Sequence, residues 1–219
     1  MSETIKIRKG LDIKLKGKAD KIFMKAPRSK TYAVKPVDFH SLTPKIVTKP
    51  CIEVKVGSTL FYDKYRPEIK FTSPVSGIVQ TIVRGERRRI IAITIEDDGK
   101  DTAEKFVQGD PNEMTREQIV ENLLESGLWP TIKQRPYDIV ASPNDDPKAI
   151  FISGFDSSPL APDYDFIMQD SEEDFQIGID ALAKLTGGEI HLGLDARYPA
   201  AKAYTDAKKV VRNLFKGPH

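Results

Sequence analysis

Four arginines within six residues form the densest group of chemically capable side chains in this sequence. They are Arg84, Arg87, Arg88 and Arg89. Guanidinium groups hold phosphates and carboxylates through paired, charge-assisted hydrogen bonds, so this group could bind a phosphate, a lipid headgroup or an acidic partner. The alternative is a solvated hairpin tip, although four arginines exceed what solubility requires.

A second candidate site is the loop 153–163, which follows an expected strand over residues 149–153. Asp156, Ser157 and Ser158 lie near its centre. Ligands of open α/β sheets bind at the carboxyl ends of the strands. We therefore predict a docking or ligand loop here, with an ordinary ordered loop as the alternative.

The sequence contains none of the common catalytic or cofactor motifs. The histidines, His40, His191 and His219, have no partner at ligand spacing, and HExxH, GxSxG, GxGxxG and GxxxxGK[ST] are absent. The single cysteine, Cys51, cannot form an internal disulfide, and its place at the start of a strand predicts a small core residue. We therefore expect no catalytic, cofactor-binding or metal-ligating residue in this chain.

Composition indicates an ordinary globular protein with an uneven charge distribution. The chain has 219 residues, of which 39% are hydrophobic and 30% charged. Residues 1–100 hold 22 Lys and Arg against 11 Asp and Glu, whereas residues 101–219 hold 12 against 21. A basic half favours docking to an acidic surface, a membrane or nucleic acid. The alternative is that the two domains have differently charged surfaces without a docking role.

Nucleic-acid binding has little support in the basic segment 6–30. Phe23 and Tyr32 could stack on bases beside these lysines. However, Ile22-Phe23-Met24 is more simply a core strand, and no RNP or KH signature is present. We expect no nucleic-acid partner.

The elements that must position these residues change in type along the chain. In residues 1–100, short runs of β-forming residues between Pro and Gly predict strands and no helix. The strands are expected over 4–8, 31–34, 52–56, 59–62, 69–72, 78–83 and 89–95. Turns are predicted at 73–77 and at 84–87, the latter closing a hairpin. Residues 97–114 are polar and indicate a linker.

Helical periodicity begins after this linker. Thr115 and Gln118 form a capping box, and Gly127 is placed to end the helix that follows. Ser171 is expected to cap a second helix, whose apolar face is Phe175, Ile179, Leu182 and Leu185. This helix separates the strands expected at 149–153 and 189–194, which predicts a parallel βαβ unit.

Several blocks in order resemble the A subunit of the bacterial sodium-translocating NADH:quinone reductase. They are Arg8-Lys9-Gly10-Leu11-Asp12-Ile13, residues 54–64, Phe71-Thr72-Ser73-Pro74-Val75-Ser76-Gly77, residues 84–88, Leu123-Leu124-Glu125-Ser126-Gly127-Leu128-Trp129-Pro130, residues 135–137, Pro159-Leu160-Ala161-Pro162-Asp163 and Phe215-Lys216-Gly217-Pro218-His219. Each block is weak alone, and the ordered series is specific.

The resemblance implies a mixed α+β fold. An all-β biotinyl/lipoyl-like (barrel-sandwich) domain is expected over 1–100, a linker over 101–114 and an incomplete Rossmann-like α/β domain over 115–219. Members of the family are about twice as long, so the chain is similar to their N-terminal half and should continue past His219.

The resemblance also implies a non-catalytic or accessory subunit that supports electron transfer from NADH to quinone, coupled to sodium export. It implies no cofactor in this chain, with the flavins and the iron–sulfur centre in partner subunits. The expected partners are the other subunits, mainly the membrane-embedded ones, with quinone as a further candidate. The expected location is peripheral, on the cytoplasmic side of the bacterial inner membrane.

Two alternatives remain open. Residues 63–67 are similar to the lysine-bearing hairpin of carrier domains, so Lys64 could be modified, although Arg66 is expected nearer the carrier position. The second alternative is the C subunit of the related ferredoxin:NAD electron-transport complex, whose cysteine sets would follow the shared domains.

Overall fold

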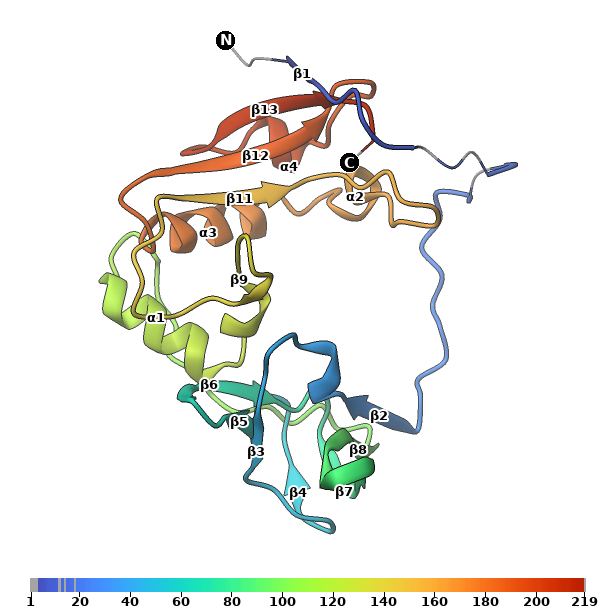
Figure 1. Cartoon of the computed structure of the whole chain (residues 1–219), viewed down its shortest axis with the longest axis vertical. Helices are drawn as coiled ribbons and strands as arrows, with labels where there is room; N and C mark the ends of the chain where they lie inside the picture. Colours follow the sequence, from blue (N-terminus) through green and yellow to red (C-terminus); the bar gives the residue numbers. More distant parts are fainter. Residues whose placement is uncertain (1–3, 12, 14, 18, 219) are drawn as a thin grey trace. The chain divides into compact units, whose positions relative to one another are not determined.

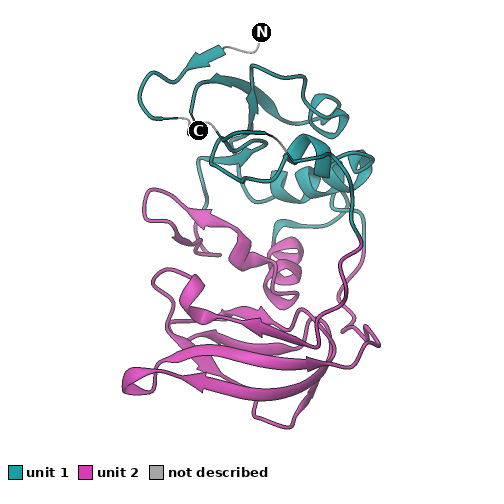
Figure 2. Ribbon diagram, turned by 90° about the vertical axis from the view of Figure 1, so that its right-hand side faces the viewer, with its two compact units in different colours: residues 1–24, 109–116, 146–219 teal, residues 25–108, 117–145 magenta. Residues whose placement is uncertain are grey.

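The protein was analysed as a computed structural model, which describes residues 4–11, 13, 15–17 and 19–218. The chain divides into two compact units, shown in different colours in Figure 2. We call residues 25–108 and 117–145 the β unit, and residues 1–24, 109–116 and 146–219 the α/β unit. His219, one of the three histidines considered above, lies outside the described residues.

The β unit contains two main antiparallel sheets, with strand orders β2-β8-β7-β4 and β3-β5-β6. The strands are β2 (Thr31–Val34), β3 (Pro44–Ile46), β4 (Glu53–Val54), β5 (Thr59–Asp63), β6 (Arg66–Thr72), β7 (Gly77–Arg84) and β8 (Ile90–Asp97) (Figure 1). Two single-turn 3-10 helices, η1 (Pro36–Asp38) and η2 (Glu86–Arg88), lie in the connections. The strands predicted between residues 31 and 95 and the predicted 84–87 hairpin are thus present, although the strand expected over 52–56 is reduced to Glu53–Val54.

The core of the β unit is made by apolar side chains of these strands, including two consecutive residues of β5 where the pairing register shifts. Leu60, Phe61, Ile69, Val79, Ile93 and Ile95 are fully buried. Phe61 stacks on Phe71 at 4.6 Å between ring centroids, and Phe39 meets Phe71 edge-on at 4.6 Å. Burial of each large apolar side chain stabilises the fold by roughly 1.5–3 kcal/mol, so this core determines which face of each strand turns inward.

Gly77 is required at the end of the predicted 73–77 turn. Its φ is +151°, and a Cβ atom built there would lie 1.9 Å from the carbonyl oxygen of Glu96. The close approach allows β7 to pair with β8 directly after the turn. Only glycine fits this position.

The β unit also contains α1 (Arg116–Glu125), η3 (Trp129–Thr131), β9 (Lys133–Gln134) and β10 (Ile139–Val140). As predicted, Gly127 ends the helix. It has a φ of +75°, and the amides of Gly127 and Leu128 donate to the carbonyls of Leu124 and Leu123. These two bonds form a Schellman motif, which satisfies carbonyls that the helix leaves unpaired. Trp129 then donates from Nε1 to the Ala141 carbonyl at 2.9 Å, which holds the following segment in place.

The α/β unit is built on a parallel sheet of order β1-β13-β12-β11. Its elements are β1 (Thr4–Lys6), β11 (Ala149–Ser153), α2 (Tyr164–Ile167), α3 (Glu172–Ala183), β12 (Glu189–Asp195), α4 (Lys202–Thr205) and β13 (Val211–Lys216). The predicted parallel strand–helix–strand arrangement is confirmed by the β11–β12 pairing.

One face of this sheet carries the core of the α/β unit. Leu192 and Leu194 of β12 pack with Tyr204 of α4 and Phe175 of α3. Ile152, Leu214 and the α2 residue Tyr164 join the same cluster. The strands β11, β12 and β13 follow one another across the sheet. Crossover connections of the same hand that advance in one direction place their helices on one face, which explains why all three helices contribute to a single core.

The N-terminal strand belongs to this sheet and not to the β unit, where the sequence placed it. Residues of β1 pair with β13 in the register Thr4↔Leu214 to Lys6↔Lys216. Its short alternating pattern suits any sheet edge, so the sequence does not identify the partner.

Two smaller predictions are wrong, and a third is confirmed only in part. Cys51 is exposed with a φ of +66°, and is not a core residue. Ile22, Phe23 and Met24 form no strand and are more than 60% exposed, although Phe23 stacks on Phe166 at 4.5 Å. Ser171 is the N-cap of α3, but its side chain makes no capping bond and instead donates to the Gln169 carbonyl.

Candidate functional site

The four arginines predicted as a site lie together at the tip of the β7–β8 hairpin. The tip is closed by bonds from the Gly85 amide to the Arg89 carbonyl and from the Arg89 amide to the Glu86 carbonyl, at 2.8 and 3.0 Å. Arg87 and Arg88 both adopt left-handed backbone conformations, with φ of 51° and 61°. Two consecutive non-glycine residues in this region are uncommon and cost conformational free energy. All four side chains are exposed.

The hairpin arginines also differ from other arginines of the chain in their partners. Within the described part of the chain, no carboxylate forms an ion pair with any of the four, and Arg84 donates only to the Arg88 carbonyl at 3.3 Å. By contrast, Arg28 binds both Asp97 and Asp101, and its hydrogen bonds lower the pKa of each carboxyl. The hairpin therefore presents positive charge that is not paired with a carboxylate of the described residues.

A hollow of about 520 Å³ lies beside this hairpin, within the β unit. Arg88, Arg89 and Ile90 line one side, and the segment from η1 to β3 lines the other. That segment contributes Pro36, Val37, Phe39, His40, Ser41, Leu42, Thr43 and Pro44. Of the four predicted arginines, Arg88 and Arg89 thus line this hollow. The sequence pattern does not predict that His40 lies beside these arginines.

The second predicted group, Asp156, Ser157 and Ser158, lies in the α/β unit after the carboxyl end of β11. Asp156 accepts a 2.7 Å hydrogen bond from the Ser158 amide, which forms a local turn. Further along the loop, Asp163 caps α2 by accepting from the Phe166 amide at 3.0 Å. Lys21 binds Asp163 at 2.7 Å, and this hydrogen bond lowers the pKa of the carboxyl. The loop is thus ordered by its own carboxylates, and its role as a ligand loop stays a prediction.

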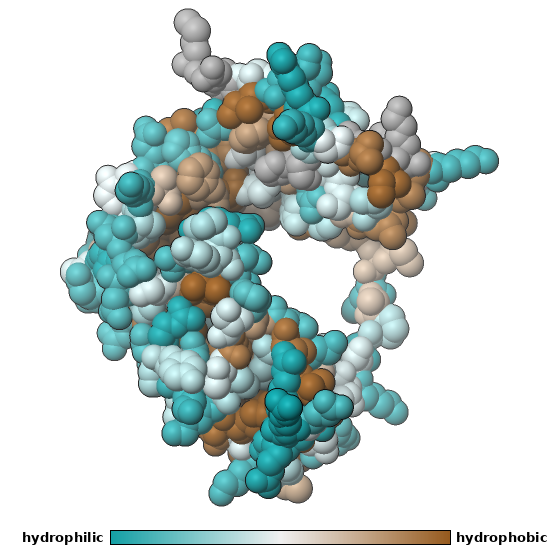
Figure 3. Space-filling model, in the orientation of Figure 1, coloured by the Kyte–Doolittle hydropathy of each residue, from teal (hydrophilic) through white to brown (hydrophobic). Residues whose placement is uncertain are grey.

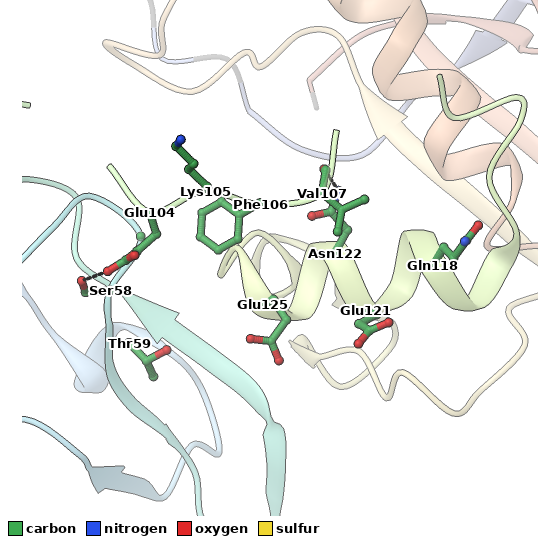
Figure 4. A pocket seen from close by; sticks show the side chains of 11 residues that line it. Ser58, Thr59, Glu104, Lys105, Phe106, Val107, Gln118, Glu121, Asn122 and Glu125 are labelled. Carbon is green, nitrogen blue, oxygen red and sulfur yellow. Dashed lines mark hydrogen bonds between the residues drawn. The ribbon is translucent and has the colours of Figure 1, made fainter. Parts of the chain in front are cut away.

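A second hollow in the β unit, of about 580 Å³, was not predicted from the sequence. Figure 4 shows it between Glu104, Lys105, Phe106 and Val107 on one side and α1 on the other. Ser58 donates to Glu104 at 2.8 Å, and Gly57, with a φ of +90°, leaves room for the Phe106 ring. The signal available in the sequence was the apolar pair Phe106-Val107 inside the polar segment 97–114.

The hairpin of the carrier alternative is also well defined. Lys64 and Tyr65 are the two residues between β5 and β6, and Lys64 is exposed with its Nζ 5.6 Å from the Tyr65 ring centroid. Arg66 is the first residue of β6, and it binds the buried carboxylate of Asp63 at 3.1 Å and the Val140 carbonyl at 2.7 Å. Lys64 thus occupies the tip with Tyr65, and the expectation that Arg66 lies nearer the carrier position stays a prediction.

The described residues contain no group of three or more His, Cys, Asp and Glu side chains able to hold a metal ion. His191 stacks on Phe151 at 4.9 Å and has its Nδ1 3.2 Å from the Asn213 amide nitrogen. Over the same described residues, no helix combines the length and the apolar character needed to cross a membrane. In the view of Figure 3, hydrophobic side chains gather in patches among hydrophilic ones.

Two family models match the chain, one for each predicted domain type. The NqrA N-terminal barrel-sandwich hybrid domain matches residues 5–98, and the NqrA second alpha/beta domain matches residues 114–219. These matches confirm the predicted fold class, a barrel-sandwich domain followed by an α/β domain.

Curated proteins extend this result over almost the entire chain. Proteins named as the A subunit of the Na(+)-translocating NADH-quinone reductase, from Photorhabdus laumondii and Yersinia pseudotuberculosis, are 34% and 35% identical over 217 residues. The protein of that name from Hahella chejuensis is 35% identical over 218 residues. Each alignment covers 98% of this chain and 48% of the relative. The chain therefore spans about half the length of the curated relatives it matches.

Proposed function

Because the chain belongs to the NqrA family, we propose that it is part of an accessory subunit of a membrane-bound Na⁺-translocating NADH:quinone oxidoreductase. The observation that carries this proposal is the succession of two NqrA domain matches over residues 5–98 and 114–219. The names of the relatives describe one subunit of a reductase. On this proposal the subunit supports electron transfer from NADH to quinone, coupled to sodium export, and contributes no catalytic residue from this chain.

The proposal places the flavins and the iron–sulfur centre in partner subunits. It places the chain peripherally, on the cytoplasmic side of the bacterial inner membrane, against the membrane-embedded subunits. The hairpin arginines support a docking role because they are exposed and, in the described structure, have no carboxylate partner. Unpaired surface charges of one sign increase the rate at which a complementary partner associates and restrict its orientation.

Extraction from the native cells tests this proposal. A tag is added to the gene, the membranes are solubilised in mild detergent, and the eluate is assayed for bound flavin and for NADH:quinone reductase activity with and without sodium. We expect flavin-bearing partners and sodium-stimulated activity in the eluate. Elution of the tagged protein alone, without that activity, would overturn the proposal.

A carrier function is the second candidate, because Lys64 is exposed at the tip of a two-residue hairpin in a barrel-sandwich domain. Intact-mass measurement of the protein from its native cells decides this point. An added mass that disappears in Lys64→Arg would establish the carrier function, and an unmodified mass in wild-type protein would exclude it.

A further inference from the structure

The hollow beside the arginine hairpin combines features that suit one class of ligand. It lies wholly within the β unit, between the tip of the β7–β8 hairpin and the segment 36–44. Its volume of about 520 Å³ falls in the range typical of small-molecule sites. It is thus larger than a single inorganic anion requires.

The charged side chains that line the hollow are those of Arg88 and Arg89. The His40 imidazole lines it too, and no Asp or Glu is among the described lining residues. Asp38 and Glu86 are near in sequence, but neither lines the hollow. An anion placed here would meet several donors and no repelling carboxylate from the lining.

The remaining lining groups suit a ligand with a polar and an apolar part. Ser41 and Thr43 provide hydroxyl groups, and Phe39, Leu42 and Ile90 provide apolar surface. Phe39 is fixed by its edge-on contact with Phe71, which is 3% exposed. The apolar side is therefore continuous with the core, and it is formed before any ligand binds.

The backbone on both sides of the hollow is held in an uncommon conformation. Ser41 has a φ of 61°, and Arg88 has the same value on the opposite side. Such residues persist only where the surrounding structure holds them, and they occur often at ligand sites. At Arg88, the conformation is accompanied by the bond that Arg84 donates to its carbonyl.

We propose that this hollow binds the phosphate group of an organic phosphate, with Arg88 and Arg89 as its principal donors. The planar guanidinium fork matches two phosphate oxygens at once, which distinguishes this site from one built on lysines. The carbon part of the ligand lies on Phe39, Leu42 and Ile90. The phosphate comes either from a soluble phosphomonoester or from the headgroup of an acidic phospholipid, and the inference does not depend on the proposed subunit role.

The test uses the 219-residue chain and two probes. Glycerol phosphate is titrated and followed by calorimetry, and vesicles of phosphatidylglycerol with phosphatidylcholine are compared with pure phosphatidylcholine vesicles by sedimentation. Saturable binding of glycerol phosphate identifies the soluble source. Binding to the acidic vesicles alone identifies the lipid headgroup.

Neighbouring arginines provide a matched control. Arg88→Gln and Arg89→Gln each remove a lining guanidinium, whereas Arg87→Gln removes an equal charge from a residue with the same left-handed backbone that does not line the hollow. We expect each lining variant to weaken binding about tenfold or more, and Arg87→Gln to change it less than about twofold.

Two results would overturn the inference. The first is the absence of binding to both probes. The second is equal weakening by all three variants, which would indicate a general charge effect of the hairpin. Unchanged thermal melting of the variants confirms that each protein is folded.

Discussion

The two units of the molecule enclose their apolar surface to different degrees. In the β unit, two antiparallel sheets and their connections bury Phe61, Ile69 and Ile93 completely. In the α/β unit, the helices pack on one face of a parallel sheet, and the register places Phe151, His191 and Val211 side by side on the other. Phe151 is 77% exposed. Parallel sheets are usually covered on both faces, so the uncovered face is the less complete part of the described structure.

This difference follows from the connections between the strands. Hairpins allow neighbouring antiparallel strands to complete a core within a short stretch of chain. The strands β11, β12 and β13 follow one another in a single direction, so their right-handed crossovers stay on one side of the sheet. To cover the second face of the parallel sheet, the α/β unit would need connections that pass over that face.

The strongest test of this comparison removes a phenylalanine from each sheet. Phe61→Ala in the β unit should lower the free energy of unfolding by about 3–5 kcal/mol, because it leaves a cavity in a close-packed core. Phe151→Ala should lower it by less than about 1 kcal/mol, because the ring is mostly in solvent. Urea unfolding followed by circular dichroism measures both. Equal losses would show that the open sheet face is in fact enclosed.

A buried ion pair provides the next largest effect. Asp63, whose side chain is 3% exposed, binds Arg66. Asp63→Asn should cost about 3 kcal/mol, because Arg66 loses its anion in a partly buried site. The pair Arg135–Asp138 has the same i,i+3 spacing but is well exposed, and Asp138→Asn should change stability by less than about 1 kcal/mol. Similar unfolding midpoints for the two variants would contradict the burial of the Asp63 carboxylate.

Glycine substitutions in the two units should have opposite signs. Gly77→Ala should cost at least about 1 kcal/mol, because its φ is +151° and the new methyl group would meet the Glu96 carbonyl. Gly178→Ala, within α3, meets no atom within 4 Å and should stabilise by about 0.5–1 kcal/mol. Thermal melting distinguishes them. A stabilised Gly77→Ala protein would contradict the turn geometry.

The smallest effect is the pH dependence that Asp180 gives the α/β unit. Burial alone would raise its pKa, but hydrogen bonds from Lys209, Asn112 and Gln176 outweigh this and lower it. A lowered pKa gives stability that is present above the unfolded value, near 3.9, and is lost as pH falls through the folded pKa.

Urea midpoints measured between pH 2 and pH 7 test this assignment. Asp180→Asn should have a shallower decline at acid pH than the wild type, because the titrating carboxylate is absent. An unchanged slope would show that other carboxylates, such as Asp163, account for the acid sensitivity.

The sequence predicted the parts of the fold that depend on local patterns. Helix α1, its end at Gly127 and the β11–α3–β12 arrangement follow from apolar periodicity and from a glycine with positive φ. The partner of β1 was not predictable, because pairing with β13 joins residues more than 200 positions apart. A three-residue strand carries too little pattern to select between sheets.

The candidate sites were predicted only as sequence clusters. The cluster of arginines was evident, but not the division into Arg88 and Arg89, which line a hollow, and Arg84 and Arg87, which do not. That division depends on the left-handed conformations of the hairpin tip and on where the segment 36–44 lies. Neither follows from residue type, because arginine rarely adopts a positive φ.

The docking role of the hairpin is tested most directly by comparing two pairs of charge reversals in the tagged chain. Arg87→Glu with Arg88→Glu alters the hairpin, and Lys25→Glu with Lys49→Glu alters exposed lysines elsewhere in the β unit by the same net charge. The measurement is the sodium-stimulated NADH:quinone reductase activity that co-purifies with each protein. The account predicts a loss of about tenfold or more for the arginine pair and near wild-type recovery for the lysine pair. Equal recovery for both pairs would contradict it.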